Sequence, residues 1–335
     1  MIGHGRGFLA ALMLAIVSVY SPLHAETLKI GTAKIAATGP IYIAQEKGYF
    51  AAEGLTVEVN YLEVAPNIAV AVVAGDIDIG DSAFSAAFFN LAGQGALKIV
   101  GGQARDVPSF KIFAVVESNK AYAAGLKSFK QLGGRTVGNT QTGSVLQYSL
   151  SLIVAKYDVA IDSLRFLALQ SLPNVVTAVT GGQADVAVIT GFLAVPAVAR
   201  GDMKLLGWTG SEVSYQAGGL YVAAKTADTK PQTIEAFLRA FRKGSQDYHD
   251  AFAGPDETRQ DGPTAAEIAA IIGKNTGQSI EDVKRTASYD DPGARLDVKD
   301  VLRQVAWYKA QGMIKGDIDG NAAIDRRYVV ALPEK

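Results

Sequence analysis

Residues 28–85 constrain the fold of this chain most, because short apolar runs alternate there with loops of small residues and with helical patterns. Residues 28–31 predict a buried strand, and residues 41–53 predict a helix. Pro40 fits the first turn of this helix, where its missing N–H is not needed, and Gly54 accepts the positive φ that ends it. A strand at 55–61, a helix at 67–74 and a strand at 75–82 follow. This order predicts an α/β sheet whose strands are mostly parallel.

Two loops of this segment, at residues 36–40 and 81–82, leave the carboxyl end of a strand and enter a helix. Open α/β sheets bind ligands at such places, because helix N-termini present unpaired N–H groups there. The sequence therefore predicts a pocket at this edge of the sheet.

The pattern occurs a second time. Residues 74–80 and 181–187 both read as a helix end, a glycine turn, an aspartate and a strand, about 107 residues apart. A repeat of this size, made of strands and helices, predicts two α/β lobes that face each other. We expect lobe 1 to comprise residues 26–112 and 217–335, and lobe 2 to comprise residues 113–216. The extended segments 110–116 and 218–223 are the predicted crossings, and they would form the hinge on which the lobes close.

The first 25 residues differ from the rest. An apolar run at 8–20 follows a short polar start with Arg6, and it is shorter than the ~20 residues that span a bilayer. This pattern predicts a signal peptide, residues 1–25, cleaved near Ala25. The mature chain would then be periplasmic.

Charge and cysteine content exclude several functions. Lys and Arg number 32 against 33 Asp and Glu, and no basic block is present, so nucleic acid and anionic membranes are not expected partners. The chain has no cysteine, which excludes a lipid anchor on cysteine, thiol catalysis and cysteine metal ligands.

Catalytic and metal motifs are missing as well. His249 is the only histidine beyond residue 25, and its helical surroundings predict a solvated side chain. No Gly-x-Ser-x-Gly turn precedes a helix at a suitable place. Asp76, Asp78 and Asp81 lack the spacing of a calcium loop. We therefore expect no catalytic residue, no metal and no cofactor, although a periplasmic enzyme that uses a carboxylate or hydroxyl remains an alternative.

The loop at 140–144 contains no phosphate-binding glycine motif. It does combine hydroxyl groups with the free N–H groups of a helix start, which suits a small anion such as a carboxylate or sulfonate. Ordinary capping of the helix by Thr142 and Ser144 explains the same residues equally well.

Three segments carry a family resemblance: residues 38–55 (TGPIYIAQEKGYFAAEGL), residues 74–80 (AGDIDIG) and residues 132–138 (LGGRTVG). They resemble the substrate-binding proteins of nitrate/sulfonate/taurine-type ABC importers, also called the thiamine-precursor-synthesis-like family. The resemblance implies a type II periplasmic binding protein, with two α/β lobes joined by two crossing strands and a ligand cleft between them. It also implies an ABC permease in the inner membrane with its cytoplasmic ATPase as partner. We expect a small organic anion as ligand, and a monomer.

Carried over to this chain, the family's ligand contacts fall at strand ends in both lobes. In lobe 1 they are Thr38, Tyr42, Ser82, Ala83 and Gln103, and in lobe 2 they are Thr142, Gly143, Ser144, Thr190, Gly191 and Phe192. The chain lacks the cysteine-rich motif and the reactive histidine of the pyrimidine synthases in this family, which argues against synthesis of a pyrimidine precursor. Binding of a pyrimidine, or service as the partner of a membrane receptor, stays an alternative.

The side chains near these loops favour an organic acid over bare nitrate. Lys34 and Arg105 are the only cations nearby in sequence, so backbone N–H groups and hydroxyls would hold the anionic head. Tyr42, Phe84 and Phe192 would contact an apolar or aromatic body, unless they belong to the core.

Overall fold

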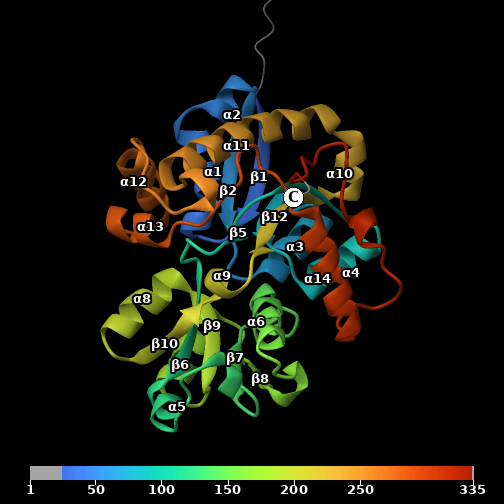
Figure 1. The fold of residues 1–335 in the computed structure, drawn as a ribbon. Helices are drawn as coiled ribbons and strands as arrows, with labels where there is room; N and C mark the ends of the chain where they lie inside the picture. Colours follow the sequence, from blue (N-terminus) through green and yellow to red (C-terminus); the bar gives the residue numbers. More distant parts are fainter. Residues whose placement is uncertain (1–24, 334–335) are drawn as a thin grey trace, which may run out of the picture.

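The computed structural model describes residues 25–333, and the predicted signal peptide lies outside them except for Ala25. The chain forms two lobes, each built on its own five-stranded sheet (Figure 1). The predicted division into two α/β halves therefore holds, while the residue boundaries given above stay a prediction.

The sheet of lobe 1 has the strand order β2 (Leu55–Tyr61), β1 (Glu26–Thr32), β3 (Ile79–Ala83), β12 (Gly218–Ala223) and β4 (Leu97–Gly102). β1 is parallel to β2 and β3, whereas β12 is antiparallel to both of its neighbours. β3 begins later than the sequence predicts, because Gly75 with φ 84° ends the preceding helix and the chain turns before Ile79.

The sheet of lobe 2 repeats this arrangement. Its order is β8 (Arg165–Ala168), β7 (Thr136–Asn139), β9 (Val186–Thr190), β6 (Phe113–Ser118) and β10 (Met203–Trp208). Here β7 is parallel to β8 and β9, and β6 is the antiparallel fourth strand. In each lobe, then, the antiparallel fourth strand, β6 or β12, is the one that the chain reaches just after leaving the other lobe.

The predicted repeat has a structural cause in two aspartates. Asp78 Oδ2 accepts the N–H of Lys29 at 2.9 Å, and Asp185 Oδ2 accepts the N–H of Thr136 at 2.9 Å. Each carboxylate thereby ties the residue just before one strand, β3 or β9, to the neighbouring parallel strand, β1 or β7. The two aspartates, 78 and 185, are 107 residues apart, and so are the two residues whose N–H groups they accept, 29 and 136.

Helices surround both sheets. Lobe 1 has α1 (Gly39–Glu46), α2 (Tyr49–Ala52), α3 (Ala65–Ala74), α4 (Ala86–Gly93), α10 (Ala224–Thr229), α11 (Pro231–Phe252), α12 (Ala265–Thr276), α13 (Ile280–Thr286) and α14 (Val298–Ala310). Lobe 2 has α5 (Asn119–Ala123), α6 (Val145–Lys156), α7 (Leu172–Thr180), α8 (Gly191–Ala199) and α9 (Thr209–Glu212). Short 3-10 turns occur at Ala36–Thr38, Phe129–Gln131, Ile161–Ser163, Pro255–Glu257 and Gly320–Ala323.

Two details of the helices differ from the sequence prediction. The helix predicted at 41–53 is two helices, because Gly48 with φ 71° breaks it between α1 and α2. Thr264 and Glu267 have the sequence spacing of a capping box, but the box does not form, since the Thr264 side chain accepts no N–H of α12. The predicted cap at Ser144 is present at α6, and Asp297 caps α14.

The core of lobe 1 lies on both faces of its sheet. On one face Ile30 packs with Ile41 of α1 and Phe237 of α11, and all three are fully buried. On the other face Ile68 of α3 and Phe88 of α4 belong to a second apolar cluster. α11 crosses α1 closely, as seen at the top of Figure 1.

A two-stranded ladder lies between the sheets. β5 (Arg105–Asp106) pairs with β11 (Tyr215–Gln216) in antiparallel fashion. The segments predicted to cross, 110–116 and 218–223, lie mostly inside β6 and β12, so the prediction was displaced along the chain. The apolar alternation of residues 110–116 and 218–223 reflects burial in a sheet rather than a crossing between lobes. The ladder that does connect the lobes is short and carries polar residues.

Hydrogen bonds tie this ladder to helices of both lobes. Asp300 of α14 accepts the N–H of Gln216 at 2.7 Å with Oδ2, and it accepts the hydroxyl of Tyr148 of α6 at 2.8 Å with Oδ1. One buried carboxylate thus joins β11, lobe 1 and lobe 2.

Candidate functional site

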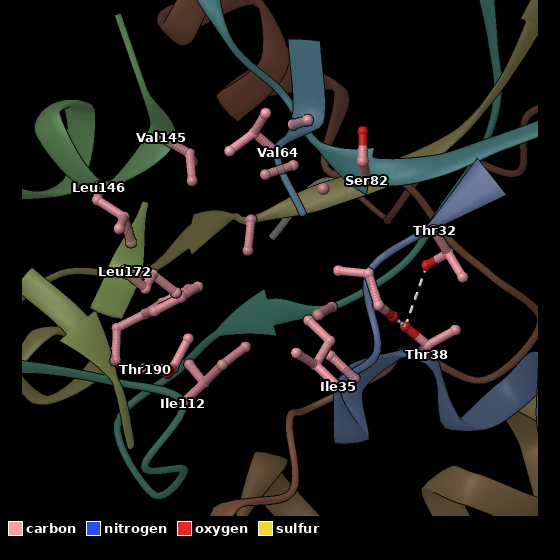
Figure 2. A pocket seen from close by; sticks show the side chains of 18 of the residues that line it. Thr32, Ile35, Thr38, Val64, Ser82, Ile112, Val145, Leu146, Leu172 and Thr190 are labelled. Carbon is pink, nitrogen blue, oxygen red and sulfur yellow. Dashed lines mark hydrogen bonds between the residues drawn. The ribbon is translucent and has the colours of Figure 1, made fainter. Parts of the chain in front are cut away.

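A cavity of about 230 Å³ lies between the lobes, at the carboxyl ends of the parallel strands. Lobe 1 contributes the loops after β1, β2 and β3, and lobe 2 contributes those after β7, β8 and β9. Side chains from the two lobes face each other across it (Figure 2). This is the place that the strand-to-helix loops of the sequence predict.

The cavity walls are mostly apolar. Ile35, Val64, Ile112, Leu146 and Leu172 all line it, and Figure 2 shows them on both sides of the space. Small residues line much of the remaining wall and leave space in the cavity, among them Ala37, Ala83, Ala104, Ala217 and Gly218. Such walls suit the apolar body of a small organic molecule better than a bare inorganic ion.

Helix N-termini converge on the cavity. α3, α4, α6, α7 and α8 all contribute residues of their first turn or their cap to its wall. Within residues 25–333 no hydrogen bond uses the N–H of Val145, Leu146 or Phe192. These groups lie at the positive ends of α6 and α8, so lobe 2 offers unpaired donors to an anionic group.

Eight of the eleven residues predicted as ligand contacts line the cavity. They are Thr38, Ser82, Ala83, Gln103, Ser144, Thr190, Gly191 and Phe192. Their contact with a ligand stays a prediction, but the structure brings them together from five separate loops.

Several of these polar groups are already hydrogen-bonded. Thr38 Oγ1 lies 3.1 Å from Thr32 Oγ1, as drawn in Figure 2, and 2.9 Å from the carbonyl of Ala33. Ser82 Oγ lies 2.8 Å from the Tyr221 hydroxyl. The Gln103 amide donates to the carbonyl of Ala37. Ser144 Oγ donates to Asn139 at 2.7 Å. The hydroxyl and amide groups thus hold the walls rigid rather than pointing freely into the space.

The other three predicted contacts do not line the cavity. Tyr42 is only 1% exposed and lies in the core of lobe 1. Thr142 is exposed to solvent outside the wall. Gly143 donates its N–H to Gln147 Oε1 at 2.8 Å and accepts the N–H of Ala86 at 2.9 Å with its carbonyl. The sequence placed these residues at the right strand ends, but it could not distinguish the rim of the cavity from its wall.

Gly191 shows why the cavity needs a glycine at the start of α8. A Cβ there would lie 2.1 Å from the carbonyl oxygen of Lys111, which belongs to the segment before β6. This close approach leaves no room for a side chain between the start of α8 and the segment before β6.

The structure places two side chains whose role the sequence left open, Phe84 and Arg105. Phe84 is fully buried and packs on Phe88 with a centroid distance of 5.2 Å, so it is core. Arg105 does not line the cavity, because its guanidinium pairs with Asp291 at 2.9 Å and with Glu257 at 3.2 Å. Lys34 is absent from the wall too, and no Lys, Arg or His lies among the lining residues that the structure describes.

The polar residues of the wall that were not predicted as ligand contacts include Asp81, Gln278 and Thr286. Asp81 is buried in β3, and Gln278 and Thr286 reach the cavity from the loop before α13 and from its last turn. Gln278 Oε1 and Thr190 Oγ1 are buried without a hydrogen-bond partner. Gln278 and Thr286 lie more than 170 residues beyond the ends of β1, β2, β3 and β4, and no local pattern connects them to the cavity.

The one histidine within residues 25–333 has a structural environment. His249 is half-buried rather than solvated as predicted, with Nδ1 3.0 Å from the carbonyl of Asp290 and its ring against Tyr289. No group of three or more His, Cys, Asp or Glu within residues 25–333 is placed to hold a metal ion. Among the same residues, no helix has both the length and the apolar character needed to cross a membrane.

Solved structures with the same fold include binding proteins and an enzyme. The alkanesulfonate-binding protein SsuA from Xanthomonas axonopodis pv. citri, bound to MOPS, superimposes with a TM-score of 0.70 at 18% identity, over 89% of this chain and 97% of that one. The periplasmic nitrate-binding protein NrtA from Synechocystis PCC 6803 gives 0.64 at 15% identity, over 89% and 84%. The desulfurization enzyme DSZB gives 0.58 at 12% identity, over 90% and 97%. These similarities confirm the predicted periplasmic-binding-protein fold, and at such identities they show the fold alone.

No curated protein matches the chain in sequence. A family model does match, over residues 36–258, which is about two thirds of the sequence and includes most of both sheets. That segment contains almost the whole wall of the cavity. The chain belongs to the NMT1/THI5-like family.

Proposed function

We propose that this protein is the periplasmic substrate-binding protein of an ABC importer and that it captures a small organic anion between its lobes. The observation that carries the proposal is the cavity itself: apolar walls from both lobes meet the unpaired N–H groups of α6 and α8. A sulfonate or carboxylate head would bind at these helix N-termini, and an apolar or aromatic body would contact Ile35, Val64 and Phe192. The two binding proteins of the same fold, which take alkanesulfonate and nitrate, support the ligand class.

The remaining parts of the proposal follow from this role. A signal peptide at residues 1–25, cleaved near Ala25, would export the chain to the periplasm, and an inner-membrane permease with its ATPase would receive the ligand. We expect the protein to act as a monomer. Binding of a pyrimidine, and the receptor role, are outcomes of the tests below. An enzyme on this fold is the second candidate, favoured by the likeness to DSZB.

A thermal-shift screen tests the ligand class. We expect alkyl and aryl sulfonates or carboxylates to raise the melting temperature, because a ligand at 100 times its Kd adds about 2.7 kcal/mol to the free energy of unfolding. Nitrate should have a smaller effect, since it leaves the apolar walls unfilled. Stabilisation by nitrate alone, or by pyrimidines alone, would contradict the proposed class. Recovery of the bound compound chemically changed would favour the enzyme.

A blocking variant makes the screen specific for the cavity. Ala83 lines the wall at the end of β3 and is half-buried, so Ala83→Trp would fill the space with an indole. The variant should lose the ligand-induced shift. Ala87→Trp is the matched control, because Ala87 lies on α4, is exposed, and is not part of the wall. A response of Ala83→Trp equal to that of the control would place the ligand elsewhere.

Closure of the lobes is a second expected property. The β5–β11 ladder connects the sheets by two short strands, and such a connection lets rigid lobes move relative to each other. We expect small-angle X-ray scattering to show a smaller radius of gyration with saturating ligand than without it. The Ala83→Trp variant should show no such change on addition of the ligand. An unchanged radius in the wild-type protein would contradict the hinge.

A further inference from the structure

A buried carboxyl group forms part of the cavity wall. Asp81 is 2% exposed and lines the cavity from β3. Its Oδ2 accepts a hydrogen bond from Thr32 Oγ1 at 3.3 Å, and its Oδ1 has no hydrogen-bond partner. An ionised carboxylate in such a place lacks both solvent and the donors that would stabilise its charge.

The groups that face Asp81 supply no positive charge. They are Tyr42 from α1, Tyr221 from β12 and Asp290 from the segment after α13. Asp290 is itself fully buried, and burial first and the Asp81 charge second raise its pKa well above the ordinary value. Burial raises the pKa of Asp81 to about 7, against a smaller opposite effect of the Thr32 hydrogen bond. Glu63, the other acid of the wall, is exposed, and water screens its charge.

This wall bears directly on an anionic ligand. The cavity measures only about 230 Å³, and no cation lines it within the described residues. An anion at the N-termini of α6 and α8 would therefore share a small, poorly solvated space with Asp81. Two like charges in such a space repel each other, so the state in which the carboxyl group is neutral has the lower free energy.

We propose that the cavity binds its organic anion together with one proton, which Asp81 holds. The proton comes from solvent and binds a carboxylate oxygen of Asp81 when the anion enters. The neutral carboxyl group then offers an O–H donor in place of a negative charge. The inference rests on the proposed function, because it requires the ligand to be an anion.

The test measures how affinity depends on pH. The probes are benzenesulfonate and hexanesulfonate, whose sulfonate groups stay ionised throughout, so any dependence arises from the protein. Isothermal titration between pH 5.5 and 8.5 should show binding to the wild-type protein about tenfold weaker at pH 8 than at pH 6, with uptake of one proton at the higher pH. Asp81→Asn should show no such dependence, because an amide does not titrate in this range.

Two more variants keep the assignment falsifiable. Asp76→Asn makes the same chemical change at an exposed position outside the wall, and it should retain the wild-type pH dependence. Asp290→Asn should retain it too, because burial already disfavours a charge on Asp290. If Asp290→Asn abolished the dependence and Asp81→Asn kept it, the assignment to Asp81 would be wrong.

The remaining outcomes separate this inference from the proposed function. Binding that is independent of pH in the wild-type protein would overturn proton uptake and leave the binding function intact. Binding that tightens as pH rises would overturn it as well, since the ionised form of Asp81 would then favour the bound state. No binding of either sulfonate at any pH would contradict the proposed function, and this inference with it.

Discussion

Replacement of Gly244 by alanine is expected to lower the free energy of unfolding by about 3 kcal/mol or more. Gly244 lies in the middle of α11, where this helix crosses α1. A Cβ at this position would lie 2.2 Å from the carbonyl oxygen of Pro40 and 3.2 Å from the Cβ of Ala44. The obstructing atom belongs to the backbone, so no side-chain rotation relieves the overlap.

The intrinsic preference of the helix points the other way. Alanine favours a helix interior over glycine by roughly 1 kcal/mol, and at an open position Gly→Ala would stabilise the protein. At Gly244 the two helices would have to separate, and the buried contacts of Phe237 and Phe241 with lobe 1 would loosen. Loss of packing along this interface outweighs the gain in propensity.

Urea denaturation followed by circular dichroism measures the difference. Gln246→Ala is the matched control, because Gln246 lies two residues further along α11 and is exposed. The control should change the free energy of unfolding by less than about 0.5 kcal/mol. A Gly244→Ala protein as stable as this control would show that α1 and α11 do not cross as closely as described.

The second large effect is a pH-dependent gain of stability in Asp106→Asn. Asp106 belongs to β5 and is fully buried, and burial raises its pKa to about 8, against a smaller opposite effect of its hydrogen bond with Thr209. Thr209 Oγ1 lies within hydrogen-bond distance of Asp106 Oδ2 and 3.1 Å from the carbonyl of Phe113. The hydroxyl has one proton for these two acceptors. A neutral Asp106 resolves the conflict by donating to Oγ1, and the amide of asparagine can do the same.

The sign of the effect follows from linkage. A carboxyl group whose pKa is raised by folding contributes stability that is fully present below its unfolded pKa of about 4 and is lost as pH rises through the folded value near 8. The wild-type protein should therefore lose stability between pH 5 and 8, and the variant should lose less. Linkage over these three pH units gives a relative gain for the variant of up to about 4 kcal/mol at pH 8, and almost none at pH 4.

Urea denaturation at pH 4, 5, 6, 7 and 8 checks this expectation. Asp162→Asn removes an exposed carboxylate of lobe 2 and should follow the wild-type curve. Parallel curves for Asp106→Asn and the wild-type protein would mean that Asp106 is ionised in the folded state. Burial also raises the pKa of Asp81 and of Asp290, so the variant should still lose some stability as pH rises.

The overall architecture could be predicted from the sequence because it depends on local rules. The alternation of 55–61, the positive-φ glycine at Gly75 and the caps at Ser144 and Asp297 are each set by a few neighbouring residues. The two-lobe division could be predicted because Asp78 and Asp185 make the same bond at the same spacing. A repeated hydrogen bond leaves a repeated pattern in the chain.

The connection between the lobes could not be placed correctly from the sequence. β5 and β11 contribute two residues each, too few to show any periodicity, and Arg105 and Gln216 are polar residues that become buried only through distant partners. Asp291, which pairs with Arg105, is 186 residues away in sequence. The breaking of the first helix at Gly48 was missed for a simpler reason, since glycine occurs inside helices as well as at their ends.

The cavity wall was predicted in part for similar reasons. Strand ends could be located, and so the loops with Thr38, Ser82 and Thr190 were found. Whether a side chain near a strand end points into the cavity or into the core depends on the neighbouring lobe, which is why the sequence left both options open for Tyr42 and Phe84. Whether Arg105 reaches the wall could not be predicted either, because its partners Glu257 and Asp291 are 152 and 186 residues away in sequence.

The hydrogen bond at the rim of the cavity has a consequence for kinetics. The N–H of Ala86, at the first turn of α4, donates to the carbonyl of Gly143 at 2.9 Å, and this bond joins lobe 1 to lobe 2 directly. If the lobes separate about the β5–β11 ladder, the bond must break before a captured molecule can leave, whereas it does not yet exist when the molecule arrives. Such a contact slows dissociation of the ligand without slowing its association. The affinity would then depend on this bond between the lobes as well as on the contacts inside the cavity.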